Sequence, residues 1–207
     1  MRQFFLPPIP AAASRAGPDD PDSDVLDLVA RGKRAIALRH LMRRHGSSVF
    51  RYCVEALREA TLAEDVHQQI FIQVNRDLPG FGGRSTVRTW LFAIARHRVL
   101  DAARARERTR ARFESSDLDA IPDPRSVPGD RLDQLRLHRA LAASLAELEE
   151  PVRTAVMLRY QQGFTYVEMA EICGERPGTL AARVTRALPL LRALVMSRLT
   201  DAPHLAP

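Results

Sequence analysis

The sequence predicts an all-α protein with two small helical domains joined by a flexible linker, the second domain being a helix-turn-helix. No segment of the 207 residues shows the sustained period-two alternation of a half-buried strand, whereas apolar residues recur at helical spacing over 25–112 and 131–199. Between these stretches the composition changes to proline and acidic residues, which is typical of a linker. The last stretch holds two short helical patterns around a glycine, the order of a helix-turn-helix.

Residues 1–24 are predicted to form a disordered N-terminal extension. They contain several prolines and an acidic cluster, so they bury too little apolar surface to offset the entropy lost on ordering. The apolar stretch FFLPPIP is interrupted by prolines and preceded by a single arginine, which does not fit a signal peptide. No apolar run reaches the length of a membrane span, so we expect a cytoplasmic protein without membrane insertion.

Residues 25–112 are predicted to form the first helical domain. Apolar residues at helical spacing begin at Val25, and Thr61 with Glu64 has the spacing of a capping box that opens a later helix. That helix carries Val66, Ile70, Phe71 and Val74 on its apolar side. A proline and three glycines over 79–83 predict a loop, and the apolar run beginning at Trp90 predicts the last helix of the domain.

Residues 113–133 are predicted to form the linker, 134–200 the second domain, and 201–207 a short tail. The linker has three prolines and few large apolar residues. Its acidic residues are Glu114, Asp117, Asp119, Asp123 and Asp130.

Two capping signals define the helix-turn-helix. Thr165 and Glu168 form a capping box, and Gly174 suits a left-handed cap at the end of the same helix. Pro177 fits the first turn of the next helix, because its missing N–H would have no partner there.

On this second helix, Arg183 and Arg186 lie on one side, and Leu180, Val184 and Leu188 are expected on the other. Such a basic second helix enters the major groove of DNA, so duplex DNA is the predicted partner. Pro189 is expected to kink or end the helix.

The composition supports a polyanionic partner. The formal net charge is +6, and nearly all positive charge comes from arginine, since Lys33 is the only lysine. Cys53 and Cys173 lie far apart among apolar neighbours and lack CxxC spacing, so we expect buried thiols rather than a disulfide or a metal site. Nothing in the sequence indicates a cofactor.

Two motifs carry a resemblance to a known family. Trp90-Leu-Phe-Ala-Ile-Ala-Arg, preceded by Ala63-Glu-Asp-Val-His-Gln-Gln-Ile-Phe and followed by the segment 163–187, resembles the extracytoplasmic-function sigma factors. The resemblance covers about 25–112 and 135–194. It implies a dissociable subunit of bacterial RNA polymerase that is not an enzyme. The first domain of such factors binds the core polymerase and opens the −10 promoter element, and the second reads the −35 element.

The resemblance assigns roles to residues of the first domain. A polar face on the helix after Thr61 would dock the polymerase, with Gln69 standing where the family usually has an acidic residue. That face is assigned to Asp65, Gln68, Gln69 and Phe71. The loop before Trp90 would hold an extruded −10 base, because a flipped base needs a pocket and polar donors. The residues assigned to −10 recognition are Arg84, Ser85, Thr86, Arg88, Arg96 and His97.

Other residues of the first domain qualify these assignments. His97 stands where the family often has asparagine, so the −10 readout is expected to differ. Trp90 itself is expected in the core at its spacing to Leu91 and Ile94. A basic rim for phosphates is expected at Arg88, Arg96, Arg98, Arg104 and Arg106.

The second domain departs from the family pattern. Ala181 and Ala182 replace the usual basic and small polar residues, so they offer no hydrogen bond to a base. We therefore expect an unusual or weak −35 preference. It would depend on Arg176, Thr179, Arg183, Thr185 and Arg186. The acidic linker fits two readings equally: an imitation of RNA in the polymerase channel, or a soluble tether.

Three other functions fit parts of the sequence. A helix-turn-helix regulator that binds DNA without polymerase explains only the second domain. A metal-dependent nuclease using Glu64 and Asp65 is disfavoured, because adjacent helical residues diverge by about 100°. A degenerate sigma-like protein could bind polymerase without initiating transcription. The family also implies an inhibitory anti-sigma partner, which the sequence does not identify.

Overall fold

The computed structural model describes residues 20–112 and 129–200, which are helical and contain no strand. The predicted linker over 113–128, the extension over 1–19 and the tail over 201–207 lie outside these residues. The elements, in chain order, are α1 (Ser23–Ala30), α2 (Arg34–Leu57), α3 (Ala60–Asp77), the 3-10 turn η1 (Leu78–Gly80), α4 (Val87–Arg112), α5 (Gly129–Glu147), α6 (Glu150–Val156), the π turn η2 (Met157–Gln161), α7 (Tyr166–Cys173) and α8 (Pro177–Thr200). The predicted all-α class is confirmed. No described helix combines the length and the low charge content that crossing a membrane requires.

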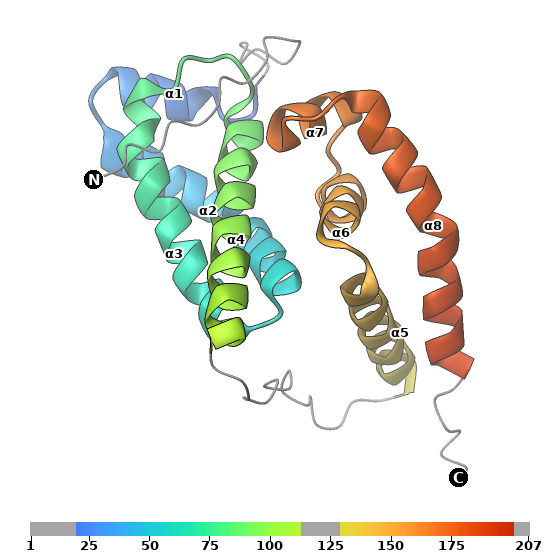
Figure 1. The fold of residues 1–207 in the computed structure, drawn as a ribbon. Helices are drawn as coiled ribbons and strands as arrows, with labels where there is room; N and C mark the ends of the chain where they lie inside the picture. Colours follow the sequence, from blue (N-terminus) through green and yellow to red (C-terminus); the bar gives the residue numbers. More distant parts are fainter. Residues whose placement is uncertain (1–19, 113–128, 201–207) are drawn as a thin grey trace.

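The helices form two groups that pack against each other. In the first group α2 packs on α1 and α3, and α4 lies against both α2 and α3; in the second, α8 packs along α5, α6 and α7. Figure 1 shows α4 at the border, with α7 beside its upper part. One continuous cluster of buried side chains runs through both groups, from Val25 and Tyr52 to Phe164 and Leu180. The two halves therefore share a core in this arrangement.

The first domain confirms several predicted buried positions. Val66, Ile70, Phe71 and Val74 are buried on α3, and Trp90 is only 8% exposed, packed against Phe81 with 5.2 Å between ring centroids. The α3 capping box was wrong. The helix begins at Ala60 after Glu59, and no side chain caps its start. Thr61 thus lies inside the first turn, where its hydroxyl cannot act as the cap.

The boundaries of the extension and the linker also differ from prediction. Asp20 and Asp22 are buried and α1 begins at Ser23, so the first domain begins before residue 25. The predicted disorder assumes that the acidic residues lack partners, but Asp22 pairs with Arg44 and His45 on α2, and Asp20 accepts hydrogen bonds from two backbone N–H groups. Helix α5 begins at Gly129, so 129–133 belong to a helix rather than to the linker.

The thiols follow the prediction in part. Cys53 is buried and Cys173 half-buried, and both are free. Burial raises the pKa of Cys53 to about 12 and that of Cys173 to about 11, which keeps both thiols protonated at neutral pH.

Candidate nucleic-acid interface

The turn between α7 and α8 is built as the sequence predicts. The Thr165 hydroxyl accepts a hydrogen bond from the Glu168 N–H at 3.2 Å, and the Glu168 carboxylate accepts one from the Thr165 N–H at 2.7 Å. Gly174 adopts a left-handed φ of 69° and donates to the Ala170 carbonyl at 2.8 Å. The capping box and the glycine cap are confirmed, so the orientation of α8 relative to α7 is fixed by local bonds.

Helix α8 buries Leu180, Val184, Ala187 and Leu191. The prediction that Leu188 faces inward was wrong, because Leu188 is 38% exposed. Pro189 does not end the helix, which continues to Thr200. Its missing N–H removes a single bond to the carbonyl of residue 185, and packing along α5 keeps the helix together across that gap.

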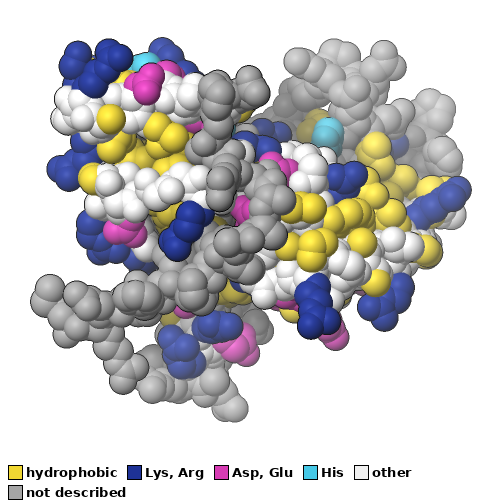
Figure 2. Space-filling view, turned by 90° about the horizontal axis from the view of Figure 1, so that it is seen from above, with side chains coloured by type: hydrophobic (Ala, Val, Ile, Leu, Met, Phe, Trp, Pro, Cys, Tyr) yellow, Lys and Arg dark blue, Asp and Glu magenta, His cyan; other side chains and the backbone are white. Residues whose placement is uncertain are grey.

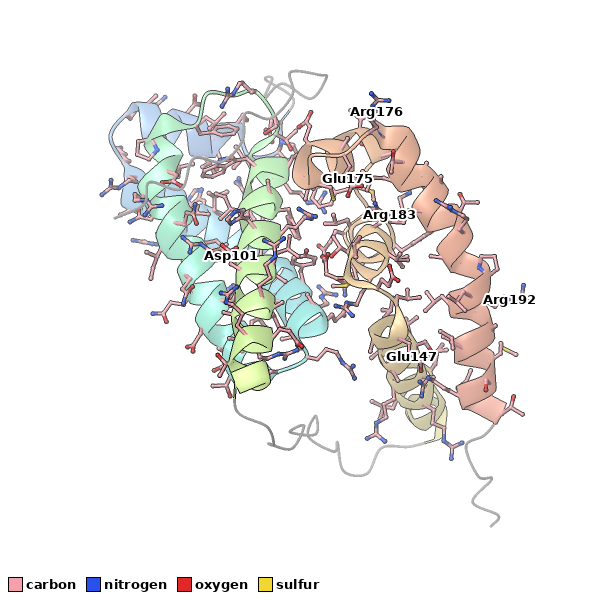
Figure 3. All side chains as sticks on the ribbon, viewed as in Figure 1. Asp101, Glu147, Glu175, Arg176, Arg183 and Arg192 are labelled. Atoms are coloured by element: carbon pink, nitrogen blue, oxygen red, sulfur yellow. The ribbon has the colours of Figure 1, made fainter. Side chains whose placement is uncertain are left out.

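The residues assigned to −35 recognition do not all have the same freedom. Arg176, Thr179, Thr185 and Arg186 are exposed. Arg183 instead forms two hydrogen bonds with the Glu175 carboxylate, at 2.9 and 2.6 Å, and these lower the pKa of Glu175. In Figure 3 Arg176 points outward from the start of α8, whereas Arg183 and Glu175 point toward each other. Arg183 must exchange this ion pair for any contact with a base.

Exposed apolar residues accompany the arginines on this half of the molecule. Figure 2 shows hydrophobic side chains gathered where α7 and α8 lie, with basic side chains around them. Val167, Leu188 and Leu190 are between 38% and 54% exposed. This face therefore offers both apolar and cationic contacts.

The loop before α4 presents fewer free side chains than predicted. Arg84 is exposed, but Ser85 is 1% exposed. The Thr86 hydroxyl accepts from the Thr89 N–H at 3.1 Å and so caps α4. Of the three loop residues assigned to a −10 base, only Arg84 is fully free to reach a ligand here.

Arg88, on the first turn of α4, points into the contact between the two halves. Its guanidinium carbon lies 4.0 Å from the centroid of the Phe164 ring and 5.7 Å from that of Phe92, and it donates to the Gln162 carbonyl. Phe92 and Phe164 pack edge to face at 5.0 Å, and both are fully buried. Burial lowers the pKa of Arg88. This contact could not be predicted from the sequence, because Arg88 and Phe164 lie about one domain apart in the chain.

Two more assigned residues follow on α4. The Arg96 Nε is buried without a hydrogen-bond partner among the described residues. His97 is more open, with 43% of its side chain exposed, and its Nδ1 lies 3.2 Å from the Asp101 carboxylate. Thus Arg88 and Arg96 face the second domain, whereas His97 remains accessible.

The distal half of α4 carries the basic rim. A groove of about 750 Å³ runs between α3 and α4 and includes Gln69, Arg98 and Asp101 along its walls. Arg98 donates to the Gln73 side chain at 2.6 Å, and Arg106 donates to the Leu57 carbonyl at 2.8 Å. The remaining arginines of the groove, Arg104 and Arg108, are exposed and suit phosphate contacts.

Three of the four residues assigned to polymerase binding lie on the outer face of α3. Asp65, Gln68 and Gln69 are exposed, but Phe71 is only 4% exposed and packs against His67 at 5.0 Å. Beside them lie two exposed apolar residues that the sequence analysis did not single out, Met42 and Ile72, at 45% and 62% exposure. They add apolar surface to this mostly polar face.

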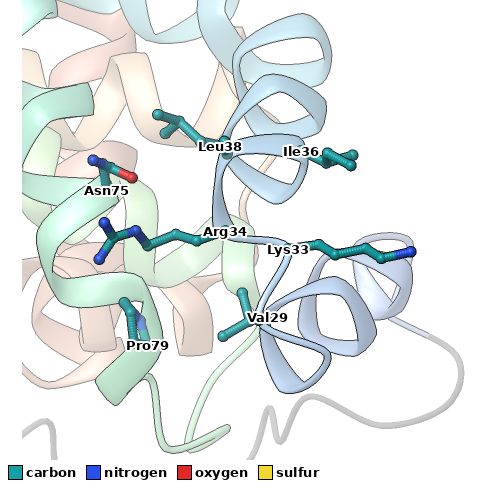
Figure 4. Close-up of a pocket in the computed structure, with 9 residues that line it drawn as sticks. Val29, Lys33, Arg34, Ile36, Leu38, Asn75 and Pro79 are labelled. Atoms are coloured by element: carbon teal, nitrogen blue, oxygen red, sulfur yellow. The ribbon is translucent and has the colours of Figure 1, made fainter.

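A second hollow, of about 670 Å³, lies between the α1–α2 turn and the end of α3. Figure 4 shows Arg34 reaching toward Asn75 and Pro79, while Lys33 points away. Its lining has no carboxylate, thiol or imidazole, and its one lysine, Lys33, points away from it.

Comparisons with known proteins match both halves. The model of "Sigma-70 region 2" matches residues 41–109, and that of "Sigma-70, region 4" matches residues 136–191. The probable RNA polymerase sigma-C factor of Mycobacterium bovis is 32% identical over 178 residues, covering 84% of this chain and 92% of the relative. The RNA polymerase sigma-H factor of Pseudomonas aeruginosa is 30% identical, covering 87% of this chain and 97% of the relative.

Two solved structures share the fold. CnrH in complex with the cytosolic domain of CnrY aligns with a TM-score of 0.64 and 23% identity, covering 85% of this chain and 97% of that chain. The sigma factor RpoE in complex with the anti-sigma factor NepR from Bartonella quintana aligns with a TM-score of 0.64 and 21% identity, covering 80% and 98%.

Proposed function

Because this chain belongs to the extracytoplasmic-function sigma factors of bacterial RNA polymerase, we propose that it joins core polymerase in the cytoplasm and reads promoters through the residues described above. The observation that carries the proposal is the presence of both sigma-70 regions, in order, on two helical halves with exposed arginines. The family acts in transcription initiation and is not known for enzymatic activity. We infer that this chain contributes binding energy rather than chemistry.

For the −35 element, the proposal assigns readout to the exposed first turns of α8. Arg176, Thr179 and Arg186 are accessible, and Arg183 becomes so when it leaves Glu175. Ala182 is exposed and Ala181 half-exposed, so the position where a base donor would stand offers only methyl groups. We expect a −35 preference that is weak or differs from that of relatives with polar residues there.

An exchange of these two alanines tests the −35 assignment. The double variant Ala181→Lys and Ala182→Ser should prefer different −35 bases. Each new contact should discriminate against the wrong base by about 1–3 kcal/mol of binding free energy. Duplexes carrying a randomised −35 segment, selected with the holoenzyme, provide the measurement. An unchanged preference would remove these positions from the readout.

For the −10 element, the proposal uses Arg84 and His97 directly and Arg88 and Arg96 after a rearrangement. Arg88 contacts Phe164, and Arg96 lies close enough to Cys173 and Glu175 to affect their pKa values, so both face the second domain in this structure. Their use on DNA therefore requires the two halves to separate.

Promoter geometry leads to the same requirement. The −10 and −35 elements are about 25 base pairs apart, which is about 85 Å of B-form duplex. Helix α8 has 24 residues and so a length of about 36 Å, and it runs along nearly the whole height of the molecule in Figure 1. The compact arrangement cannot span both elements. The 16 residues from 113 to 128 can reach at most about 55 Å, enough to allow a wide separation.

For the polymerase, we propose the α3 face formed by Asp65, Gln68 and Gln69, extended by the exposed Ile72. This face stays exposed while the halves are packed together, so polymerase can engage it before they part. Both similar solved structures are complexes with another protein, and in one of them a sigma factor is bound to an anti-sigma factor. We propose such an inhibitory partner here as well.

In vitro transcription tests the proposal as a whole. Core polymerase with and without this protein is supplied with a fragmented genomic library, and start sites that depend on the protein are mapped. We expect a set of promoters sharing −10 and −35 sequences. A protein that binds these fragments without core polymerase, and supports no transcript with it, would instead be a plain helix-turn-helix regulator.

A further inference from the structure

The acidic residues around the start of α1 bind to α2, contrary to the predicted disorder. Asp22 is 1% exposed, and its two carboxylate oxygens lie 3.0 Å from Arg44 Nη1 and 2.7 Å from His45 Nε2. Asp24 accepts two hydrogen bonds from Arg44, at 2.6 and 2.7 Å, and lies 3.0 Å from His40 Nδ1. We call Asp20, Asp22 and Asp24 the acidic clamp.

The third member of the clamp reaches a different part of the fold. Asp20 is 7% exposed, and its Oδ1 accepts from the Asp22 N–H at 3.0 Å. Its Oδ2 accepts from the N–H of Val87 at 3.3 Å, across 67 residues of sequence. Val87 is the first residue of α4, so a carboxylate lies at the positive end of that helix, where a negative charge is stabilising.

This bond holds one end of the loop over 81–86. Two backbone N–H groups in the first turn of α4 donate to side chains. The Thr89 N–H donates to the Thr86 hydroxyl, and the Val87 N–H donates to the Asp20 carboxylate. Ser85, immediately before them, is buried. The exposed Arg84 therefore projects from a loop whose end is fixed partly by a residue at the other end of the domain.

We propose that Asp20 is a positioning residue for −10 recognition. Held to α2 through its neighbours Asp22 and Asp24, it sets the position of the loop that carries Arg84 and of the first turn that carries Arg88. Asp20 lies outside residues 41–109, the part that the region 2 model matches. The inference rests on the proposed role of this loop in holding a −10 base.

The test compares base discrimination by holoenzymes that differ at one aspartate. The probe is a fluorescein-labelled single strand carrying the −10 segment of a promoter mapped by the library transcription, alongside strands with each −10 base replaced. Asp20→Ala should lower the affinity ratio between cognate and replaced strands by about three- to tenfold, the effect of one lost hydrogen bond. Discrimination at the −35 element, measured on duplexes, should not change. Asp20→Asn keeps one oxygen acceptor and should recover part of the ratio.

Asp27 on α1 provides the matched control. Its side chain is exposed, so Asp27→Ala removes one negative charge close to the acidic clamp. It should leave the affinity ratios for the −10 strands and for the −35 duplexes unchanged. A ratio is used because loss of folded protein lowers the binding of cognate and replaced strands equally and cancels. If Asp20→Ala weakens both strands alike, or neither, Asp20 is only structural and the inference is overturned. If the wild-type holoenzyme itself does not discriminate among −10 bases, the proposed role of the loop fails instead.

Discussion

Replacing Phe164 by alanine should loosen the contact between the two halves. Phe164 belongs to the second half but is fully buried against α4, where its ring packs on Phe92 and under Arg88. Alanine removes both contacts and leaves a space that the backbone cannot fill.

The structure gives the size of the effect. An edge-to-face aromatic pair contributes about 0.5–1.5 kcal/mol, and a partly desolvated cation–π contact about 0.5–2 kcal/mol. Together they stabilise the closed arrangement by about 1–3 kcal/mol, so their loss should raise the open population by about 5- to 150-fold.

The two cysteines report the opening. Cys173 lies on α7, which packs on α4, whereas Cys53 is in the core of the first half. Burial contributes most to the raised pKa of Cys173, so opening should make this thiol more acidic and more reactive. We expect iodoacetamide, followed by peptide mass spectrometry, to modify Cys173 faster in Phe164→Ala by the same factor, with Cys53 still protected.

A second variant separates opening from unfolding of α7 and α8. Arg88→Ala removes the same cation–π contact from the α4 side without touching the second half, and should also accelerate modification of Cys173. Tyr160→Ala, an exposed aromatic residue near Phe164, should have no effect. If Phe164→Ala accelerates the reaction but Arg88→Ala does not, the second half is unfolding rather than separating, and our reasoning about the interface fails.

Three further predictions follow from other contacts. Arg96→Leu removes a buried, unpaired Nε, so the free energy of unfolding should change by less than about 1 kcal/mol. The slope of log affinity against log salt concentration for −10 DNA should decrease by the equivalent of about one phosphate contact. A large loss of stability in urea would contradict this. Thr165→Ala should lower stability by about 1 kcal/mol in urea unfolding, because the cap of α7 is lost. Burial would raise the pKa of Asp22, but the bonds from His45 and Arg44 outweigh it and lower the pKa, and the bonds from Arg44 lower that of Asp24. The stability that these pairs give is therefore complete above about pH 4 and lost as the pH falls below it, and the urea midpoint should fall less steeply in Arg44→Ala.

Local signals explain what the sequence could predict. A capping box and a glycine cap involve residues within a few positions of one another, so Thr165, Glu168 and Gly174 were assigned correctly. The same reasoning failed at Thr61, because a cap depends on where the preceding chain turns, and that is set by packing beyond the motif. At Pro189 only the expected end of the helix was wrong, since packing of α8 on α5 outweighs one missing hydrogen bond.

Contacts between distant residues explain what it could not predict. The Asp20–Val87 bond and the Arg88–Phe164 contact join residues more than sixty positions apart, and each depends on how whole helices meet. The composition of 1–24 indicated disorder because the arginine and histidine partners of its aspartates lie on another helix. Residue types thus predicted the helices, while the partners of the charged residues came from the tertiary arrangement.

The nature of the interface between the halves suits a contact that must be broken. An interface of aromatic residues alone would expose only apolar surface on opening, at a cost of about 25 cal/mol per Å². Here two arginines lie within it, and one has a buried Nε without a partner among the described residues, so opening restores their hydration and frees them for phosphates. The unpartnered Arg96 therefore weakens the closed arrangement, and the hydration that Arg88 regains on opening offsets part of the cation–π contact that it loses. For this reason promoter DNA, which binds the arginines in the open arrangement, should shift the equilibrium readily from the closed to the open arrangement.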